Sequence, residues 1–115
     1  MKKICFISNS GWAIYNFRSN LMECLAKQDY QIECIVNEDK FSNLIKWPTH
    51  KLMGHPQSMN LVKQIHSMWR LFNHLRVSDY DLLNVYTIRA CLEVAFINIF
   101  IRKRVILNIT GLGIL

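Results

Sequence analysis

The amino-acid sequence predicts an α/β protein with a Rossmann-like parallel sheet and helices on both of its faces. Short apolar segments alternate along the chain with longer segments of helical periodicity. The short segments are apolar at consecutive positions, which is typical of strands buried on both faces of a parallel sheet. A length of 115 residues indicates one domain. We expect residues 1–115 to form a single, partial Rossmann-like domain.

The first predicted elements are a strand, a helix and a second strand. Residues 3–8 are almost continuously apolar and predict a buried strand. A helix should follow, with Asn16 as its N-cap and its end near Asp29. Residues 31–36 alternate in polarity and predict the second strand. The expected apolar stripe of the helix consists of Phe17, Leu21, Cys24 and Leu25.

The middle of the chain predicts one long helix after two short elements. Residues 41–45 are expected to make a helical turn and residues 51–53 a short strand, with a turn at residues 54–56. Residues 61–76 have the clearest helical pattern in the chain. The predicted apolar stripe of this helix consists of Leu61, Ile65, Met68, Trp69, Phe72 and Leu75.

The last third predicts two further strands around a helix. Residues 82–85 and 105–109 are short and apolar, as buried strands are. Residues 90–101 are apolar nearly all round, which is expected of a helix packed between layers. A membrane-inserted hairpin is the alternative for this segment, although it is too short to span a bilayer as a single helix. No secretory signal is recognisable at the N-terminus.

The net charge of +6 is concentrated in residues 40–78, which contain no acidic residue. The basic residues there are Lys40, Lys46, Lys51, Lys63, Arg70 and Arg76, and all four histidines lie in the same segment. Such a segment is either a solvated face or a surface for anionic headgroups or phosphates. We expect Lys63, Arg70 and Arg76 to make such contacts. Nucleic acid is not expected as a partner, because aromatic residues do not interleave with these charges.

Cysteine and histidine spacing predicts no metal site and no cofactor. The four cysteines are far apart and lie within apolar patterns, so we interpret them as reduced core thiols of a cytoplasmic protein. His50 and His55 have no ligand partner at metal spacing, and His66 and His74 are expected on the surface. No segment has the pattern of a catalytic nucleophile.

Three loops are predicted to lie at the carboxyl ends of the strands, where ligands of parallel sheets bind. They comprise residues 8–16, 86–90 and 110–113. The first contains Asn9, Ser10 and Gly11, whose backbone N–H groups could hold an anion. The second contains Thr87 and Arg89, a hydroxyl and a guanidinium suited to a sugar or a phosphate. Ordinary turns are the alternative for each loop. The third loop contains Thr110, Gly111 and Gly113.

The segments "SNSGWAIYNFRSNL", "YDLLNVYTIRA" and "VILNITGLG" give the chain a family resemblance. In this order and spacing, the chain resembles the amino-terminal domain of glycosyltransferase family 4, two-domain sugar transferases of GT-B architecture. The resemblance covers essentially the whole chain. It is most specific for the subgroup that builds bacterial capsule, O-antigen and exopolysaccharide chains. Two departures concern the second loop: members often have His in place of Asn84 and Pro in place of Ala90.

The resemblance implies a function and a set of site residues. The complete enzyme would transfer a hexose from a nucleotide sugar to a lipid-linked or growing glycan, at the inner face of the membrane. Residues 9–11, with Asn16 and Arg18, would face the donor diphosphate. Thr87, Arg89 and residues 110–113 would line the acceptor side. The domain that binds most of the nucleotide sugar would be separate, so we expect this chain to be inactive alone.

Three explanations are compatible with the missing second domain. The chain could be a fragment, which we favour, a subunit of a split enzyme with a separate carboxy-terminal-domain chain, or a small stand-alone module. Two alternative functions remain. One is a non-catalytic module that recruits a catalytic subunit to the membrane through residues 40–78. The other is a small flavodoxin-like nucleotide-binding domain.

Overall fold

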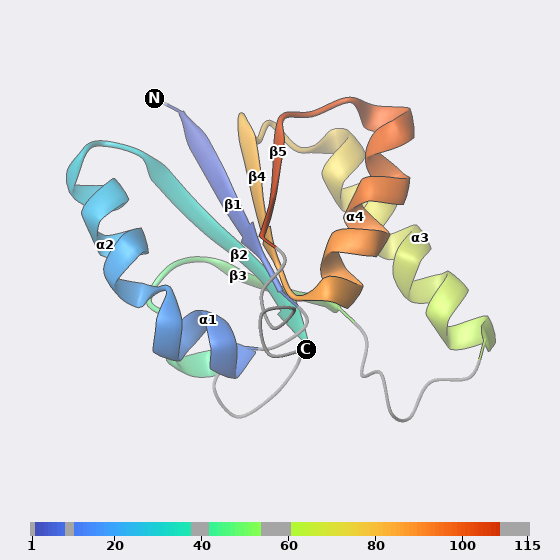
Figure 1. Cartoon of the computed structure of the whole chain (residues 1–115), viewed down its shortest axis with the longest axis horizontal. Coiled ribbons are helices and arrows are strands. Elements are labelled where there is room, and N and C mark those ends of the chain that lie inside the picture. Colours follow the sequence, from blue (N-terminus) through green and yellow to red (C-terminus); the bar gives the residue numbers. More distant parts are fainter. Residues whose placement is uncertain (1, 9–10, 38–41, 54–60, 109–115) are drawn as a thin grey trace.

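The computed structural model describes residues 2–8, 11–37, 42–53 and 61–108 and contains five strands and four α-helices within these ranges (Figure 1). In chain order the elements are β1 (Lys3–Ile7), α1 (Gly11–Phe17), α2 (Ser19–Lys27), β2 (Gln31–Asn37), the 3₁₀ turn η1 (Ser42–Leu44), β3 (Thr49–Met53), α3 (Leu61–Val77), β4 (Leu82–Tyr86), α4 (Ile88–Ile101) and β5 (Val105–Asn108). The predicted turn at residues 54–56 lies outside the described residues.

The five strands form one parallel sheet in the order β3-β2-β1-β4-β5. β1 is the central strand: Phe6 is in register with Cys34 of β2 on one side and with Asn84 of β4 on the other. The chain therefore moves outward from β1 first in one direction and then in the other, which is the strand order of a Rossmann-like half. The predicted fold class is confirmed.

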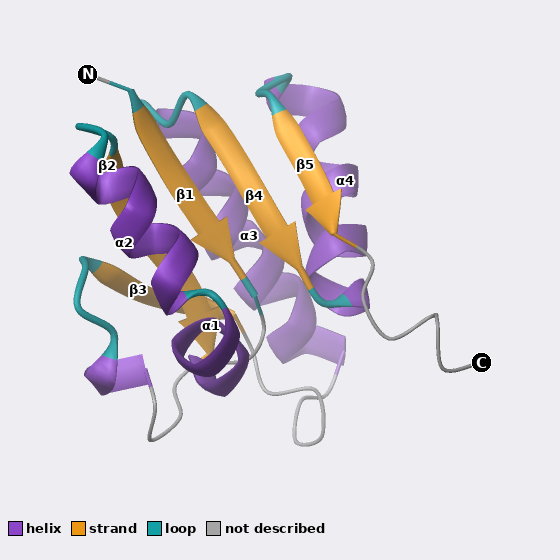
Figure 2. Ribbon diagram, turned by 60° about the vertical axis from the view of Figure 1, so that its left-hand side comes forward, coloured by secondary structure: helices purple, strands orange, loops and turns teal. Residues whose placement is uncertain are grey.

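Two helical layers cover the sheet, with α1 and α2 on one face and α3 and α4 on the other (Figure 2). Successive residues of β1 pack against the two layers in turn, because successive side chains of a strand point to opposite faces. The cluster beneath α3 and α4 contains Cys5, Ile7, Ile35, Leu71, Leu75, Tyr80, Leu83, Val85, Ala90, Cys91, Val94 and Ile97. The cluster beneath α1 and α2 contains Ile4, Phe6, Ile14, Met22, Ile32, Cys34, Val36 and Tyr86.

The predicted single helix after β1 is two helices that break at Arg18. Asn16 lies inside α1 and is exposed, so its prediction as an N-cap is wrong. The break changes which face of the second helix meets the sheet. Met22 is fully buried, whereas Leu21 is 41% exposed and Cys24 is also exposed. The predicted stripe through Leu21 and Cys24, and the core position of that thiol, are therefore incorrect.

The outer faces of α3 and α4 are more exposed than the sequence pattern predicts. Leu71 and Leu75 of α3 are buried, but Ile65 and Trp69 of the same predicted stripe are exposed. The exposed residues of α4 are Leu92, Phe96, Ile99 and Phe100. The prediction that α4 packs between layers is wrong, because it lies in the outer layer and buries only the face toward the sheet. It is one continuous helix and not a hairpin.

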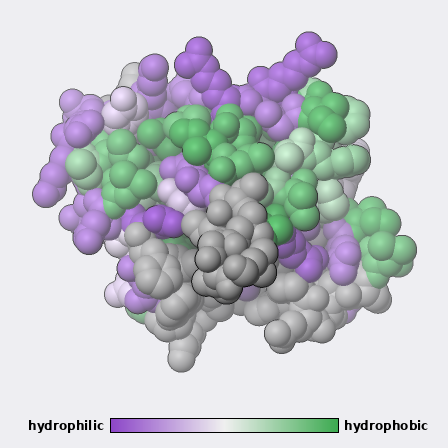
Figure 3. Space-filling view, in the orientation of Figure 1, coloured by the Kyte–Doolittle hydropathy of each residue, from purple (hydrophilic) through white to green (hydrophobic). Residues whose placement is uncertain are grey.

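The strand β5 is an edge strand with half-exposed side chains, which corrects its prediction as a buried strand. Ile106 is 47% exposed and Leu107 is 42% exposed. Helices α1 and α2 cover the part of this sheet face that is distant from β5. The part formed by β4 and β5 therefore remains accessible beside α2 (Figure 2). Hydrophobic atoms gather on the surface there (Figure 3). Among the described residues, no helix has the length and apolar content that crossing a membrane requires.

Candidate functional site

The carboxyl ends of the strands define the candidate site. All strands are parallel, so β1, β4 and β5 end at the same edge of the sheet and lie side by side (Figure 2). The chain leaves β1 toward α1 on one face and leaves β4 toward α4 on the opposite face. Ligands of open parallel sheets bind where neighbouring connections diverge in this way. The structure thus places the beginnings of two predicted loops, at Ser8 and Tyr86, on neighbouring strand ends, whereas residues 110–113 of the third loop lie outside the described residues.

The turn from β1 to α1 is tied to the end of β2. Ser8 is fully buried, and its N–H donates to the carbonyl oxygen of Ile35 at 3.0 Å. The N–H of Gly11 donates to Oδ1 of Asn37 at 3.2 Å. This contact occupies the Gly11 N–H, one of the backbone donors that we expected to hold an anion. Sequence reasoning missed the role of Asn37, which it interpreted only as a polar stop after the strand. Asn9 and Ser10 lie outside the described residues.

Arg18, at the break between α1 and α2, reaches the end of β4. Its guanidinium carbon lies 4.2 Å from the centroid of the Tyr86 ring, within the range of a cation–π interaction. No carboxylate among the described residues forms an ion pair with it. The predicted site residue Arg18 is therefore a half-buried cation beside the carboxyl edge. The predicted Asn16 lies two residues earlier, in α1, and is exposed.

A line of polar side chains connects Tyr86 to the edge strand. Asn84 Nδ2 donates to the Tyr86 hydroxyl at 2.9 Å, and Asn108 Nδ2 donates to Asn84 Oδ1 at 2.6 Å. Asn108 Nδ2 also lies 3.1 Å from the carbonyl oxygen of Val85. Asn84 thus links Tyr86 to Asn108 and takes a structural place between β4 and β5. Sequence reasoning missed Asn108, because nothing in its local pattern indicates this contact.

Thr87 joins β4 to α4 with an unusual backbone conformation. Its φ is 72° and its ψ is 141°. Positive φ is sterically costly for a β-branched residue, of order 1–3 kcal/mol. Such conformations are often found at binding and catalytic sites. Helix α4 begins directly after Thr87, at Ile88, which is two residues before its predicted start. Thr87 therefore lies where the sequence placed it, at the carboxyl end of β4.

Arg89 lies in the first turn of α4 and is partly engaged. Its Nε atom is 3.7 Å from Oε1 of Glu93, one turn further along the helix. Burial raises the pKa of the Glu93 carboxyl, and the nearby guanidinium only partly offsets this effect. Arg89 is half-buried rather than a freely exposed loop arginine. An anion at this edge would compete with Glu93 for the guanidinium.

The remaining predicted residues fall into two groups. Lys63, Arg70 and Arg76 lie exposed along α3, as expected of a basic helix surface. Thr110, Gly111 and Gly113 lie outside the described residues. The basic surface and the carboxyl edge are thus separate candidate features. Only the edge combines strand ends, two cations and polar side chains.

A second polar cluster lies between the sheet and α3, and sequence reasoning missed it. His50 Nε2 lies 2.9 Å from Oε1 of Glu33, and the rings of His50 and His74 are 4.4 Å apart. The Tyr80 hydroxyl contacts both Glu33 and His74. The prediction of His74 as a surface residue is wrong, since it is half-buried here. Glu33, His50 and His74 come from β2, β3 and α3, so no sequence spacing could have indicated that they meet.

The comparisons with known proteins establish the fold alone. No protein-family model matches the chain, and no curated protein matches it. Among solved structures, the chain is similar to the C-terminal domain of a hydrogenase from Pyrococcus furiosus, with a TM-score of 0.54. The identity is 12%, and the match covers 94% of this chain and 91% of that one. This likeness is consistent with the α/β Rossmann-like class.

Proposed function

We propose that this chain is the acceptor-side portion of a glycosyltransferase of GT-B architecture. The complete enzyme would transfer a hexose from a nucleotide sugar to a lipid-linked or growing glycan in polysaccharide biosynthesis. The observation that carries the proposal is the adjacency of β1, β4 and β5. Of the three segments that resemble family 4 transferases, the first directly follows the end of β1, and the other two contain the ends of β4 and β5. They would therefore form one continuous ligand-facing edge.

The chemistry of the edge suits a diphosphate-linked sugar. Arg18 and Arg89 supply guanidinium groups, which bind phosphate oxygens in bidentate fashion. Asn84, Asn108 and Thr87 supply amide and hydroxyl groups of the kind that bind sugars. Catalysis in the complete enzyme would consist of positioning and of electrostatic stabilisation of the departing nucleotide diphosphate. The second domain would supply most of the nucleotide-sugar contacts.

A water-soluble, short-chain prenyl-diphosphate sugar is the probe for the acceptor site. We expect saturable binding by titration calorimetry, weakened at least about tenfold in Arg89→Ala, since a charge-assisted hydrogen bond is worth roughly 1.5–3 kcal/mol. Arg104→Ala is the matched control, because this exposed arginine precedes β5 at the opposite edge of the sheet. Equal weakening in both variants, or no saturable binding by the wild type, would contradict the proposal. The chain alone should not turn over UDP-hexose with this acceptor.

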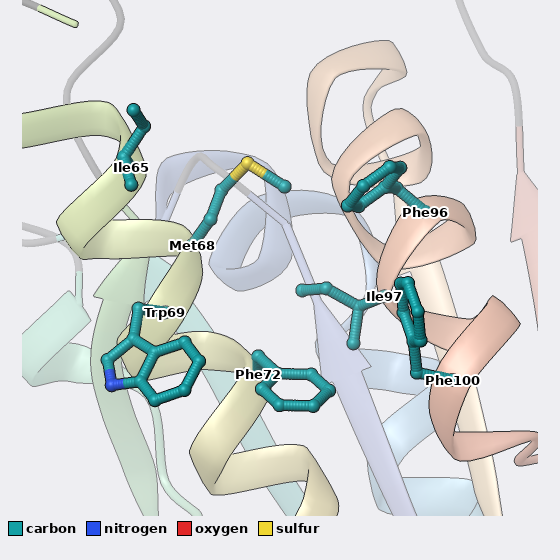
Figure 4. A pocket seen from close by; sticks show the side chains of 7 residues that line it. All are labelled: Ile65, Met68, Trp69, Phe72, Phe96, Ile97 and Phe100. Atoms are coloured by element: carbon teal, nitrogen blue, oxygen red, sulfur yellow. The ribbon is translucent and has the colours of Figure 1, made fainter. Parts of the chain in front are cut away.

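Membrane recruitment is a second candidate, favoured by an exposed apolar groove between α3 and α4. The groove has a volume of about 410 Å³, and its lining side chains face one another across the two helices (Figure 4). Four of the seven lining residues belong to α3, and the same helix carries the exposed basic residues Lys63 and Arg70. Apolar side chains together with basic ones are typical of surfaces that bind anionic bilayers. The lining consists of Ile65, Met68, Trp69, Phe72, Phe96, Ile97 and Phe100.

Liposome flotation tests this second candidate. We expect the chain to float with phosphatidylserine-containing vesicles and to be released as salt is raised. Trp69→Gln should reduce flotation, because Trp69 is 59% exposed and lines the groove. Leu92→Gln is the matched control: Leu92 is 68% exposed but does not line the groove. This function would be excluded if flotation changed neither with the salt concentration nor in Trp69→Gln.

The strand order bears on the flavodoxin-like alternative. Flavodoxin-like domains have the order 2-1-3-4-5, whereas the order here is β3-β2-β1-β4-β5. The topology therefore favours the Rossmann-like relationship. A thermal shift with nucleotides but not with nucleotide sugars would still support a simple nucleotide-binding domain.

A further inference from the structure

The cluster of Glu33, His50 and His74 has the composition of a metal site. One ligand atom from each of the three side chains lies within 4.8 Å of the others. All three are partly buried, so solvent can reach them but does not surround them. They come from β2, β3 and α3, three elements fixed by the sheet and its helical layer. A preformed arrangement of this kind lowers the entropic cost of binding an ion.

Two imidazoles and one carboxylate are a recurring ligand set for zinc in proteins, with a fourth position left open to water or substrate. We propose that Glu33, His50 and His74 bind a divalent transition-metal ion, with Zn²⁺ as the best fit to these ligands. Softer ions would prefer thiolates, and Mg²⁺ or Ca²⁺ would prefer oxygen ligands alone. The proposal concerns a site on the α3 face of the sheet and is independent of the proposed sugar-transfer function.

The present contacts are close to those that an ion would require. Bonds from zinc to nitrogen or oxygen are about 2.0 Å long, so two ligands of a tetrahedral ion lie about 3.3 Å apart. His50 Nε2 and Glu33 Oε1 are 2.9 Å apart. A small increase in this distance would let an ion lie between the two atoms and bond to both of them in place of their hydrogen bond. The ring centroids of His50 and His74 are 4.4 Å apart, so both imidazoles lie close enough to turn toward a common ion.

The charges around the cluster also permit a cation. Lys3 contacts the other carboxylate oxygen of Glu33, at 2.9 Å, and is the one repulsive group in the described contacts of Glu33. The same ammonium already contacts Asp79 at 3.0 Å, so it has an alternative partner nearby. The side chains of Lys3, Glu33 and Asp79, one cation and two carboxylates, carry a net negative charge. A divalent ion would reverse that charge rather than add to an existing positive one.

Metal binding needs deprotonated ligands. Burial alone would raise the pKa of Glu33, but hydrogen bonds from Lys3, His50 and Tyr80 outweigh it and lower the pKa to about 2. Burial and the neighbouring His50 lower the pKa of His74.

Tyr80 orients the proposed ligands. Its hydroxyl lies 2.8 Å from Glu33 Oε1 and 2.7 Å from His74 Nε2. Hydrogen-bonding partners of this kind fix the orientation of metal ligands and contribute to affinity. Tyr80 is 5% exposed and belongs to the hydrophobic cluster beneath α3, so its position is well determined by packing. A hydrogen-bonded network without any ion is the competing interpretation.

Calorimetry with Zn²⁺, after chelator treatment and desalting, tests the proposal. We expect one ion per chain, and Co²⁺ should give the visible absorption of a tetrahedral site. His50→Gln and His74→Gln should each weaken binding at least about tenfold, a scale typical even of outer ligand partners. His66→Gln and Cys24→Ser are the controls, since both residues are exposed and outside the cluster.

Two results would overturn the metal site. The wild-type chain could show no saturable Zn²⁺ binding, which would leave a hydrogen-bonded network as the interpretation. Alternatively, both glutamine variants could bind as tightly as the wild type, which would place the ion elsewhere. Far-UV circular dichroism of each metal-free variant separates loss of the site from loss of the fold. If one variant fails to fold, the other variant and the wild-type titration still decide.

Discussion

At the scale of single residues, the carboxyl edge contains groups held in unfavourable states. Thr87 is β-branched yet has a positive φ, and Glu93 is a carboxylate largely removed from water. Both lie beside Arg89, the predicted phosphate-binding residue. Strained backbones and shifted pKa values often mark functional sites, although ion pairs within a fold also cause such shifts. Here the first feature directly follows β4, and the second lies in the second turn of α4.

Glu93→Gln should stabilise the protein at neutral pH. Burial raises the pKa of Glu93 above its unfolded value, so ionisation opposes folding. Protonated Glu93 contributes its full stabilisation below the unfolded pKa, and this stabilisation is lost as the pH rises through the folded pKa. The variant should therefore gain stability relative to the wild type between about pH 4 and pH 7. Urea unfolding at both pH values measures the difference.

Glu23→Gln is the control with the opposite sign. The hydrogen bond from Lys46 lowers the pKa of Glu23 on the exposed surface of α2. The wild type should therefore gain stability relative to this variant as the pH rises. The interpretation of Glu93 would fail if its variant showed the same trend as the Glu23 variant.

At the scale of elements, the break at Arg18 decides which residues of α2 are buried. Met22 is fully buried, and the neighbouring Leu21 is 41% exposed. We expect Met22→Ala to lower the free energy of unfolding by about 2–5 kcal/mol, the usual cost of a core truncation. Leu21→Ala should cost less than about 1 kcal/mol, because it removes only partly buried surface. Chemical denaturation of the two variants measures both effects.

The same pair tests the sequence-based helix against the observed one. A continuous helix with Leu21 and Cys24 facing the sheet would reverse the order of the two losses. The sequence predicted the existence of this helix correctly, because the 3.6-residue periodicity is local. It did not predict the face, because the interruption at Arg18 shifts that periodicity. The guanidinium–ring contact with Tyr86 that accompanies the break depends on β4, more than 60 residues away.

At the scale of the whole molecule, the two core clusters should unfold together. β1 contributes Cys5 and Ile7 to one cluster and Ile4 and Phe6 to the other. Neither face can lose its packing without disturbing the central strand. Small single domains also usually unfold in one transition. We therefore expect a single cooperative unfolding step, although the layers lie on opposite faces of the sheet.

Tryptophan fluorescence tests this coupling. With Trp12 and Trp69 replaced by Phe, Trp47 reports on the cluster beneath α1 and α2, against which it packs. With Trp12 and Trp47 replaced, Trp69 reports on α3. In each variant, the fluorescence midpoint in urea should coincide with the circular dichroism midpoint. Different midpoints within one variant would indicate that the two layers unfold separately.

Apart from the break at Arg18, the sequence by itself determined the order and type of the elements, because each depends on local periodicity. Continuous apolar runs indicated β1 and β4, and a helical repeat indicated α3. Only the tertiary structure decided which apolar residues are buried, because burial depends on neighbours that the chain supplies elsewhere. Ile106 is exposed at a sheet edge and Phe100 in an outer layer for this reason. The meeting of Glu33, His50 and His74 was likewise decided by folding, since three separate elements place them in contact.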